Sequence, residues 1–298
     1  MTRTARISIA FLLTAFIAGC AGRAASPLDR YVVLITVDGL RPDAIAAAGA
    51  RNIQGLLLQS AHSLNARTVD PPETLPSHVT IATGLFPAAH GVHHNTDQGG
   101  TLAAPTIFSR VRDAGGRSAL YFGKSKLSLL SGPGNADLLW GPGPRGAGPE
   151  RGAVATVAAR FAADFPKLRF NFSWVHLREP DGAGHAQGWM SEPYFAALRE
   201  ADAAVGVILQ AIAASDVAQR TAVILSTDHG GEKTTHWSGS EASMIIPWMC
   251  RAPGAAAVTI VEPVRSVDTA PTVLALLNLP ALTDIEGRTV AACLPAPV

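Results

Sequence analysis

Side chains that commonly bind metal ions follow three separate apolar runs in this sequence. In each case an aspartate comes within a few residues of the end of the run, and two of the runs also supply histidine. The residues are Asp38, then Asp181 and His185, then Asp228, His229 and His236. Carboxylate oxygens and imidazole nitrogens, with no thiolate close by in the sequence, form a ligand set that suits zinc. Three such groups together favour a metal site.

Each residue taken alone also has an ordinary structural interpretation. An aspartate before glycine, as at Asp38, is most often part of a turn. The pair Asp228-His229 is typical of a capped loop, and His236 could be a surface histidine. The metal-site hypothesis therefore depends on whether the fold brings the three groups together.

A candidate nucleophile stands in the segment Asp70–Gly84 (DPPETLPSHVTIATG). Thr74 is predicted to lie where a loop enters a helix that runs to about Thr83. A hydroxyl at that position is close to free backbone N–H groups, which favour phosphate, and a nearby divalent metal can promote loss of its proton. The alternative is that Thr74 only caps the helix. Asn95 offers an amide that could hold a phosphoryl oxygen.

The order of the predicted elements indicates an α/β fold with a mainly parallel central sheet and helices on both faces. The predicted strands are Tyr31–Val37, Ser118–Phe122, Phe170–His176, Ala222–Thr227 and Ile245–Cys250. Helical patterns cover Ala44–Ala48, Ile53–Ser60, Pro105–Ala114, Ala153–Phe165, Pro193–Ala214 and Thr269–Leu277. Ser131–Gly152, rich in Gly and Pro, is predicted to be an irregular surface loop. Ligands of open α/β sheets bind at the carboxyl ends of strands, so the polar groups are expected to converge there.

Composition limits the possible partners. The 298 residues are 48% hydrophobic and 16% charged, with a formal net charge of +1. So balanced a charge gives no reason to expect binding to a nucleic-acid polymer. Residues 30–298 are expected to form a single catalytic domain.

The N-terminus is typical of an export signal. Arg3 and Arg6 precede the apolar run Ile7–Ala18, whose twelve residues are short for a membrane span. Ile17–Cys20 (IAGC) is similar to a bacterial lipoprotein box, which predicts a signal peptide at 1–19, a lipidated Cys20 and a tether at 20–29. The alternative is an ordinary secretory signal cleaved near residues 21–25. Either way the protein is expected to be exported to the periplasm or cell surface.

The other two cysteines, Cys250 and Cys293, would then lie in an oxidising compartment. They are interpreted as a possible disulfide or as two buried thiols, because the sequence does not show whether they are close.

Together these motifs resemble the alkaline phosphatase superfamily, and most of all its type I phosphodiesterase/nucleotide pyrophosphatase branch. The resemblance runs from about Tyr31 to Val290 and includes Val267–Pro280 (VDTAPTVLALLNLP), followed by Ile285–Arg288 (IEGR). It implies the alkaline-phosphatase-like fold and two zinc ions per chain. It also implies hydrolysis of a small phosphate ester through a phosphothreonine.

The resemblance also implies a role for each residue. Asp38, Asp228 and His229 match one metal site, which Thr74 joins as the nucleophile, and Asn95 matches the phosphoryl-binding amide. Asp181, His185 and His236 match the second metal site. In longer relatives the last histidine lies far downstream, whereas compact members have a short spacing like that of His236. His236 is therefore preferred over the remaining candidates His62, His78, His90, His93 and His94.

Two further features bear on the substrate. The sulfatase signature, Cys or Ser followed by x-Pro-x-Arg, is absent, because Leu-Pro-Ser-His follows Thr74. Lys124-Ser-Lys126 resembles the lysine pair of phosphonoacetate hydrolases, which would favour a substrate with extra negative charge; the alternative is a solvated basic loop. We expect a phosphodiesterase or nucleotide pyrophosphatase activity. A phosphomonoesterase or phosphonoacetate-hydrolase-like enzyme is the alternative, and a non-catalytic surface lipoprotein is the alternative outside enzymes.

Overall fold

The computed structural model describes residues 28–97, 101–132, 134–148, 153–280 and 284–295. The predicted signal peptide, Cys20 and most of the tether lie outside the described residues. In the described part of the chain, no helix is both long enough and apolar enough to cross a membrane.

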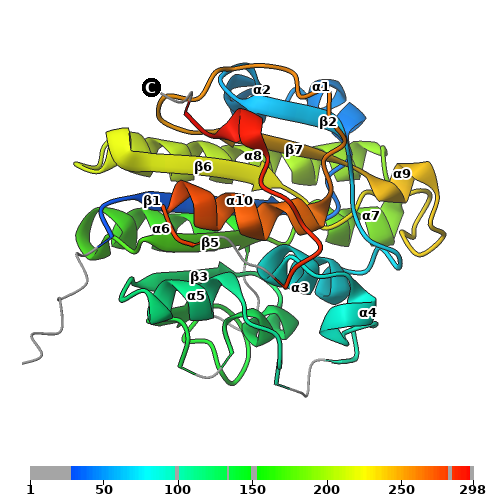
Figure 1. Ribbon diagram of the computed structural model, residues 1–298. Helices are drawn as coiled ribbons and strands as arrows, with labels where there is room; N and C mark the ends of the chain where they lie inside the picture. Colours follow the sequence, from blue (N-terminus) through cyan, green and yellow to red (C-terminus); the bar gives the residue numbers. More distant parts are fainter. Residues whose placement is uncertain (1–27, 98–100, 133, 149–152, 281–283, 296–298) are drawn as a thin grey trace, which may run out of the picture.

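A mixed sheet of seven strands forms the centre of the molecule, in the order β2-β7-β6-β1-β5-β3-β4 (Figure 1). The central strands are β1 (Tyr31–Val37), β5 (Phe172–Leu177) and β6 (Thr221–Ser226), which run parallel and are almost entirely buried. β3 (Ser118–Phe122) and β4 (Leu138–Trp140) extend the sheet in parallel on one side. These strands are continuously apolar in sequence because helices cover both faces of the sheet, so side chains on either face are buried.

The far side of the sheet departs from the parallel pattern. β7 (Ile245–Arg251) is antiparallel to both β6 and β2 (Ala61–Arg67). β2 was not predicted, because its sequence AHSLNAR alternates irregularly and leaves Leu64 partly exposed at the edge of the sheet. The prediction that Ser131–Gly152 is wholly irregular was wrong. It contains β4, whose three residues are too few to show a strand period.

Helices pack on both faces of the sheet, which confirms the predicted α/β fold (Figure 1). One face is covered by α3 (Thr74–Thr83), α5 (Ile107–Asp113) and α10 (Thr269–Leu276). The other face is covered by α1 (Pro42–Ala47), α2 (Arg51–Leu58), α6 (Val154–Leu168) and α8 (Glu192–Ala213). Alternate residues of β1 divide between the two cores: Val32 and Leu34 face the first, and Val33 and Ile35 face the second.

Three short α-helices, four 3-10 helices and a disulfide complete the described fold; the 3-10 helices are η2 (Ser125–Ser131), η3 (Ala218–Arg220), η4 (Ser266–Asp268) and η5 (Ala291–Cys293). α4 (Pro87–His90) follows α3, α7 (Asp181–Gln187) follows β5, and α9 (Glu241–Met244) leads into β7. Cys250 at the end of β7 is joined to Cys293 by a disulfide, which fastens the C-terminal segment to the sheet. Of the two interpretations of these cysteines, the structure therefore shows the bonded one.

Candidate active site

Asp38 is the first residue after β1 and lies fully buried at the carboxyl end of the sheet. Its Oδ2 lies 2.9 Å from His176 Nε2 and 2.8 Å from Lys124 Nζ. Burial alone would raise the pKa of Asp38, but the Lys124 ammonium and the hydrogen bond to His176 hold that pKa well below its usual value. Asp38 is therefore an anion at neutral pH, as a metal ligand must be.

Asp228 and His229 follow β6, the strand next to β1, and are also fully buried. The Asp228 Oδ1 accepts hydrogen bonds from the backbone N–H groups of Gly39 (3.2 Å) and His229 (3.1 Å). Its Oδ2 points toward His229 Nε2, at 3.2 Å. Burial raises the pKa of Asp228 and the nearby Asp38 carboxylate raises it further, so a cation between the two would stabilise both carboxylates.

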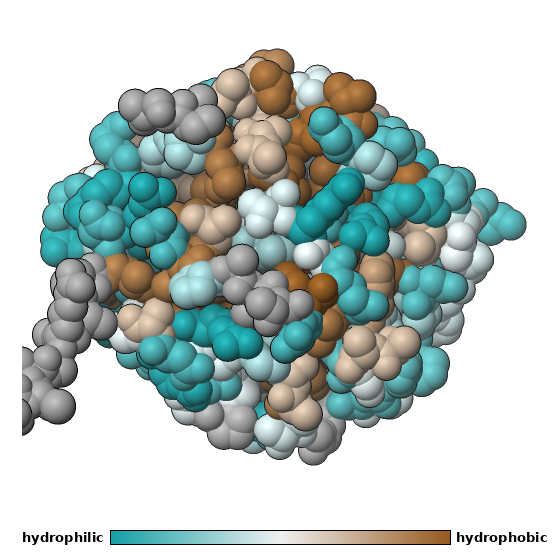
Figure 2. Space-filling view, viewed as in Figure 1, coloured by the Kyte–Doolittle hydropathy of each residue, from teal (hydrophilic) through white to brown (hydrophobic). Residues whose placement is uncertain are grey.

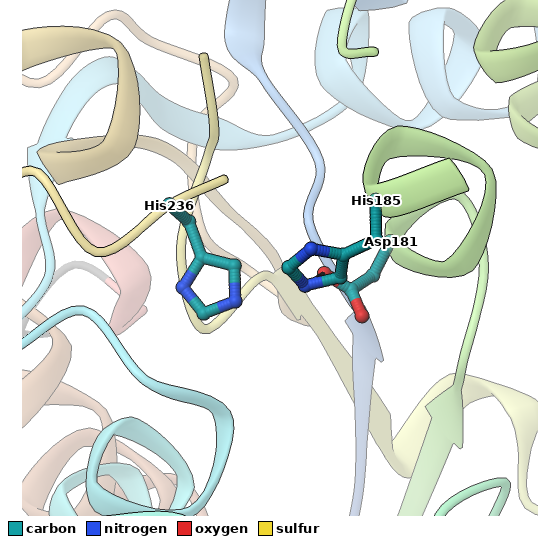
Figure 3. A group of neighbouring side chains, drawn as sticks. All are labelled: Asp181, His185 and His236. Carbon is teal, nitrogen blue, oxygen red and sulfur yellow. Dashed lines mark ion pairs between the residues drawn. The ribbon is translucent and has the colours of Figure 1, made fainter. Parts of the chain in front are cut away.

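Asp181, His185 and His236 form a second group, in which the side chains point toward one another (Figure 3). Asp181 and His185 lie one turn apart on α7, and His236 comes from the loop after β6. The ring nitrogens that face away from the group are held in place. His185 Nδ1 lies 3.0 Å from the Thr234 carbonyl, and His236 Nδ1 lies 2.6 Å from the Pro72 carbonyl. In both rings Nδ1 is therefore the donor, which leaves Nε2 as the acceptor.

Buried polar atoms that lack a hydrogen-bond partner show whether these residues suit metal ions. Among the described residues, six buried side-chain polar atoms have no hydrogen-bond partner. Four of the six belong to this site: Asp38 Oδ1, Asp181 Oδ1, Asp228 Oδ2 and His229 Nε2. A buried acceptor without a partner costs about 1–3 kcal/mol, so four together at one place favour a site that binds cations. The residues fit divalent metal ions.

The grouping differs in two respects from the sequence-based assignment: Asp181 belongs to both groups of ligand atoms, and Asp228 belongs to neither. Ligand atoms of Asp38, Asp181 and His229 lie within 4.8 Å of one another, and those of Asp181, His185 and His236 do likewise. Asp181 thus belongs to both groups, whereas the resemblance placed it in one. Burial lowers the pKa of His236 to about 3, helped by the charge of His229, so its ring is neutral and able to bind a metal.

Thr74 is the first residue of α3 and is almost completely buried. The residue that caps the helix is Glu73, and the Thr74 side chain makes no capping hydrogen bond. The alternative interpretation of Thr74 as an N-cap is therefore wrong, and its hydroxyl is available for chemistry. The nearest cation is Lys124 Nζ, at 3.4 Å from Thr74 Oγ1.

Asn95 lies beside the start of α3, and its amide has a defined orientation. The Asn95 Oδ1 accepts the backbone N–H of Leu75 at 2.9 Å. That bond leaves the Nδ2 hydrogens free to donate, as a phosphoryl-binding amide requires. Glu73 fixes the backbone, because its Oε2 accepts the N–H of Asn95 at 2.8 Å. No motif in the sequence had singled out Glu73.

Lys124 and Lys126 differ in their contacts. Lys124 Nζ lies 2.6 Å from Asp181 Oδ2 and thereby links Asp181 to Asp38. Burial lowers the pKa of Lys124, but the two carboxylates raise it overall, so the side chain is a cation. Lys126 is partly buried, and burial followed by the charge of Lys124 lowers its pKa. The alternative of a fully solvated basic loop does not fit this arrangement.

Two histidines that sequence reasoning did not select support the site. The His176 Nε2 contacts the Asp38 carboxylate, as described above, and its Nδ1 accepts the Gly123 N–H at 3.1 Å. His78 lies one turn after Thr74 on α3, with Nδ1 2.7 Å from the Thr74 carbonyl. Burial lowers the pKa of His78 to about 4, so the neutral ring donates from Nδ1 and accepts at Nε2 from the Thr36 hydroxyl. The i, i+4 spacing from Thr74 was the only sequence signal for His78.

The family model for type I phosphodiesterase / nucleotide pyrophosphatase matches residues 32–114 and 128–242. Ectonucleotide pyrophosphatase/phosphodiesterase family member 3 of Rattus norvegicus is 28% identical over 222 residues, which cover 68% of this chain. The match spans only 25% of that protein, so this chain corresponds to about a quarter of its curated relative.

Solved structures share the fold at lower sequence identity. Murine ectonucleotide pyrophosphatase/phosphodiesterase 5 has a TM-score of 0.69 at 16% identity, covering 87% of this chain and 97% of the murine chain. The phosphonate monoester hydrolase of Silicibacter pomeroyi also has a TM-score of 0.69, at 17% identity, covering 90% of this chain and 77% of its own. These likenesses confirm the expected architecture.

Proposed function

Because the chain belongs to the type I phosphodiesterase/nucleotide pyrophosphatase family, we propose that it hydrolyses phosphoric esters in a metal-dependent reaction, with phosphodiesters or nucleotide-type pyrophosphates as substrates. One observation carries the proposal: four buried, unpartnered ligand atoms lie at the sheet edge where α3 presents the Thr74 hydroxyl. That arrangement supports metal binding beside a nucleophile.

The residues can be given roles from their contacts. Asp38, Asp181, Asp228, His185, His229 and His236 would hold the metal ions, and zinc suits such a mixture of carboxylates and imidazoles. The chemistry that divalent ions supply when bound there is Lewis-acid catalysis, which favours the ionised form of a nearby hydroxyl and offsets charge on a leaving oxygen.

Thr74 would act as the nucleophile. Its Oγ1 attacks phosphorus as the ester P–O bond breaks, and the leaving oxygen departs as an alcohol or phosphate that takes up a proton from solvent, to which the Thr74 hydroxyl proton passes. The phosphothreonine that remains still carries the second ester group of a diester. Water then attacks the same phosphorus, the bond from phosphorus to Oγ1 breaks, Thr74 regains its proton, and the phosphate monoester is released. The Asn95 amide and the Lys124 ammonium are placed to bind non-bridging oxygens, whose negative charge is the feature an enzyme must stabilise in this reaction.

The preference for a diester rests on the family and on the room at the site. His185 remains partly exposed, with a side-chain exposure of 38%, so one side of the metal groups is open to solvent. A solved structure of murine ectonucleotide pyrophosphatase/phosphodiesterase 5 contains AMP, which supports a nucleotide-type substrate in the family.

Lys124 and Lys126 favour the second candidate, a phosphomonoesterase or phosphonoacetate-hydrolase-like activity. Two lysines near the metal groups would stabilise the extra negative charge of a monoester dianion more than they would a diester monoanion. Comparing kcat/KM for p-nitrophenyl phosphate and bis-p-nitrophenyl phosphate decides between the candidates. We expect a diester preference that persists in the double variant Lys124→Ala/Lys126→Ala; a monoester preference that disappears in this variant would favour the second candidate.

The covalent mechanism is tested by Thr74→Ala. We expect hydrolysis of the better substrate to fall by at least about 10³-fold, because the nucleophile is lost while the metal ligands stay. Thr80→Ala, on the same helix, is the control for packing, since its hydroxyl pairs with His90 and not with the site. Activity of the Thr74→Ala variant close to that of the natural protein would exclude the phosphothreonine.

A non-catalytic lipoprotein is tested by metal analysis. Retention of all six predicted metal ligands argues against it, because a chain that had lost catalysis would be under no constraint to keep all six. Fewer than about one metal ion per chain, together with no hydrolysis of either ester, would support it.

The cellular location is also a proposal. We propose that the protein is exported, that cleavage precedes Cys20, and that Cys20 carries lipid. Mass spectrometry of the N-terminal peptide tests this: an unmodified N-terminus after Cys20 would leave export possible and remove the anchor.

A further inference from the structure

Arginine side chains gather at the end of the sheet opposite the candidate active site. Four of them come just before a parallel strand, and the fifth is the last residue of β7, which runs the other way and so ends at the same edge. We call this edge the arginine face; its members are Arg30, Arg117, Arg169, Arg220 and Arg251.

Local acids neutralise only part of this charge. Arg117 pairs with Asp137 at 3.5 Å, and Arg169 pairs with Asp216 at 2.7 Å. The other three members form no ion pair with any residue that the structure describes. Asp29 is close in sequence, but Arg220 reaches only its backbone carbonyl, at 3.3 Å. The arginine face therefore carries an excess of positive charge.

The unpaired arginines line two neighbouring hollows. The first has a volume of about 360 Å³, and its lining includes Arg30, Arg220 and Tyr31. The second has a volume of about 300 Å³ and includes Arg251. The two share Gln219, Ala252 and Pro253. Arg220 lies over the Tyr31 ring at 5.6 Å, which holds its guanidinium near the first hollow.

The chain enters the fold at the same edge. Leu28 and Asp29, the first described residues, lie directly before β1, and Asn171 Nδ2 donates to the Leu28 carbonyl at 2.8 Å. Eight residue steps separate Leu28 from Cys20, and eight steps span at most about 28 Å. A membrane anchor at Cys20 would therefore keep the arginine face within about 28 Å of the bilayer.

The opposite edge of the sheet holds the candidate active site. Its buried carboxylates Asp38 and Asp181 pair with Lys124. In Figure 1 the described chain starts at the left-hand end of the sheet, whereas α3 and α7 lie toward the right. Figure 2 shows hydrophilic residues at this left-hand end and also at the right-hand end of the same view.

We propose that the arginine face lies against an anionic phospholipid surface, which directs the candidate active site away from the membrane. Guanidinium groups bind lipid phosphates by charge-assisted hydrogen bonds, and each basic residue near an anionic bilayer strengthens attachment roughly fivefold. The inference does not depend on the proposed reaction. It combines the charge of this edge with the place where the N-terminal segment joins the fold.

Partition of the purified full chain between buffer and vesicles tests the proposal. One set of vesicles is phosphatidylcholine alone, and the other contains phosphatidylglycerol as one lipid in three. The proposed lipid on Cys20 would attach equally to both, so the ratio of the two partition coefficients reports the charged surface alone. We expect tighter binding to the anionic vesicles, and a ratio that falls roughly 30-fold in Arg30→Gln/Arg220→Gln.

A matched variant controls for net charge. Arg51→Gln/Arg199→Gln removes the same charge from the start of α2 and the first half of α8, away from the arginine face. The ratio should stay near that of the natural protein. Thermal unfolding of both double variants shows whether each is folded, and single variants replace a double variant that is not.

Hydrogen exchange on the vesicles then tests orientation. Amides of 216–221 and 251–254 should exchange more slowly on the anionic vesicles, while those of α3 and α7 should be unchanged. Equal partition into both vesicle types would overturn the proposal and would favour an acidic protein as the partner of this face. Slower exchange at α7 instead would also overturn it, because the site would then face the membrane.

Discussion

His176 shows how a residue outside the ligand set can control it. Because its Nδ1 accepts the Gly123 N–H, the ring hydrogen must be on Nε2, where it is donated to Asp38 Oδ2. This bond fixes the Asp38 carboxylate so that Oδ1 stays free. A ligand held in this way loses less freedom when it binds a metal.

We predict that His176→Ala weakens zinc binding by about 10–100-fold, the usual cost of removing a partner of a metal ligand. A competition titration against a zinc indicator measures the change. His62→Ala, on β2, is the control, because its ring contacts Ser60 and Thr259 and not the site. Equal zinc affinity in both variants would show that Asp38 needs no support from His176.

At the scale of elements, the close packing of α7 against the turn after β1 depends on one glycine. Gly39 follows Asp38 with φ = +73°, and a Cβ at this position would lie 3.0 Å from the Asp181 Cα. Its carbonyl accepts hydrogen bonds from Trp189 Nε1 and the Tyr194 hydroxyl, both at 2.9 Å. The turn after β1 therefore sets the distance between the ligands Asp38 and Asp181.

We predict that Gly39→Ala reduces both stability and metal binding, whereas Gly49→Ala reduces stability alone. Gly49 has nearly the same φ, +69°, but no atom within 4 Å of a Cβ. Each variant should lose about 1–2 kcal/mol in urea unfolding from the left-handed backbone. Only Gly39→Ala should also displace Asp181, which a zinc titration would detect; equal zinc affinity in the two variants would contradict this.

At the scale of the whole molecule, metal ions should link segments that are far apart in the sequence but meet at the carboxyl ends of the strands. The candidate ligands come from the ends of β1, β5 and β6 and from the loops beyond them. A ligand that binds only the folded state stabilises it by about 2.7 kcal/mol at a hundredfold excess over its Kd. The folded protein should therefore be more stable with metal than without it.

We predict that chelation with EDTA lowers the melting temperature and abolishes ester hydrolysis, and that added zinc restores both. Differential scanning calorimetry and metal analysis of the same sample measure the effect. Magnesium at equal concentration is the control, because it binds weakly to imidazole. A melting temperature indifferent to EDTA in a metal-loaded sample would mean that the unpartnered atoms are not metal ligands.

The sequence by itself determined the parts of this protein that depend on local pattern. Continuous apolar runs identified the buried strands, such as β1 and β6, and the run of residues after Thr74 identified α3. The resemblance rested on short motifs at strand ends, because Asp38, Asp228 and His229 directly follow their strands in the sequence. Such motifs can be recognised from the sequence because each involves only a few neighbouring residues.

Only the tertiary structure decided the features that depend on distant residues. The short strand β4 and the edge strand β2 form because partner strands supply their hydrogen bonds, so their own sequences hardly identify them. Partnership between His176 and Asp38, which are 138 residues apart, has no local signal. The gathering of five arginines at the edge opposite the site is also invisible in a net charge of +1, because strand direction determines which residues share an edge.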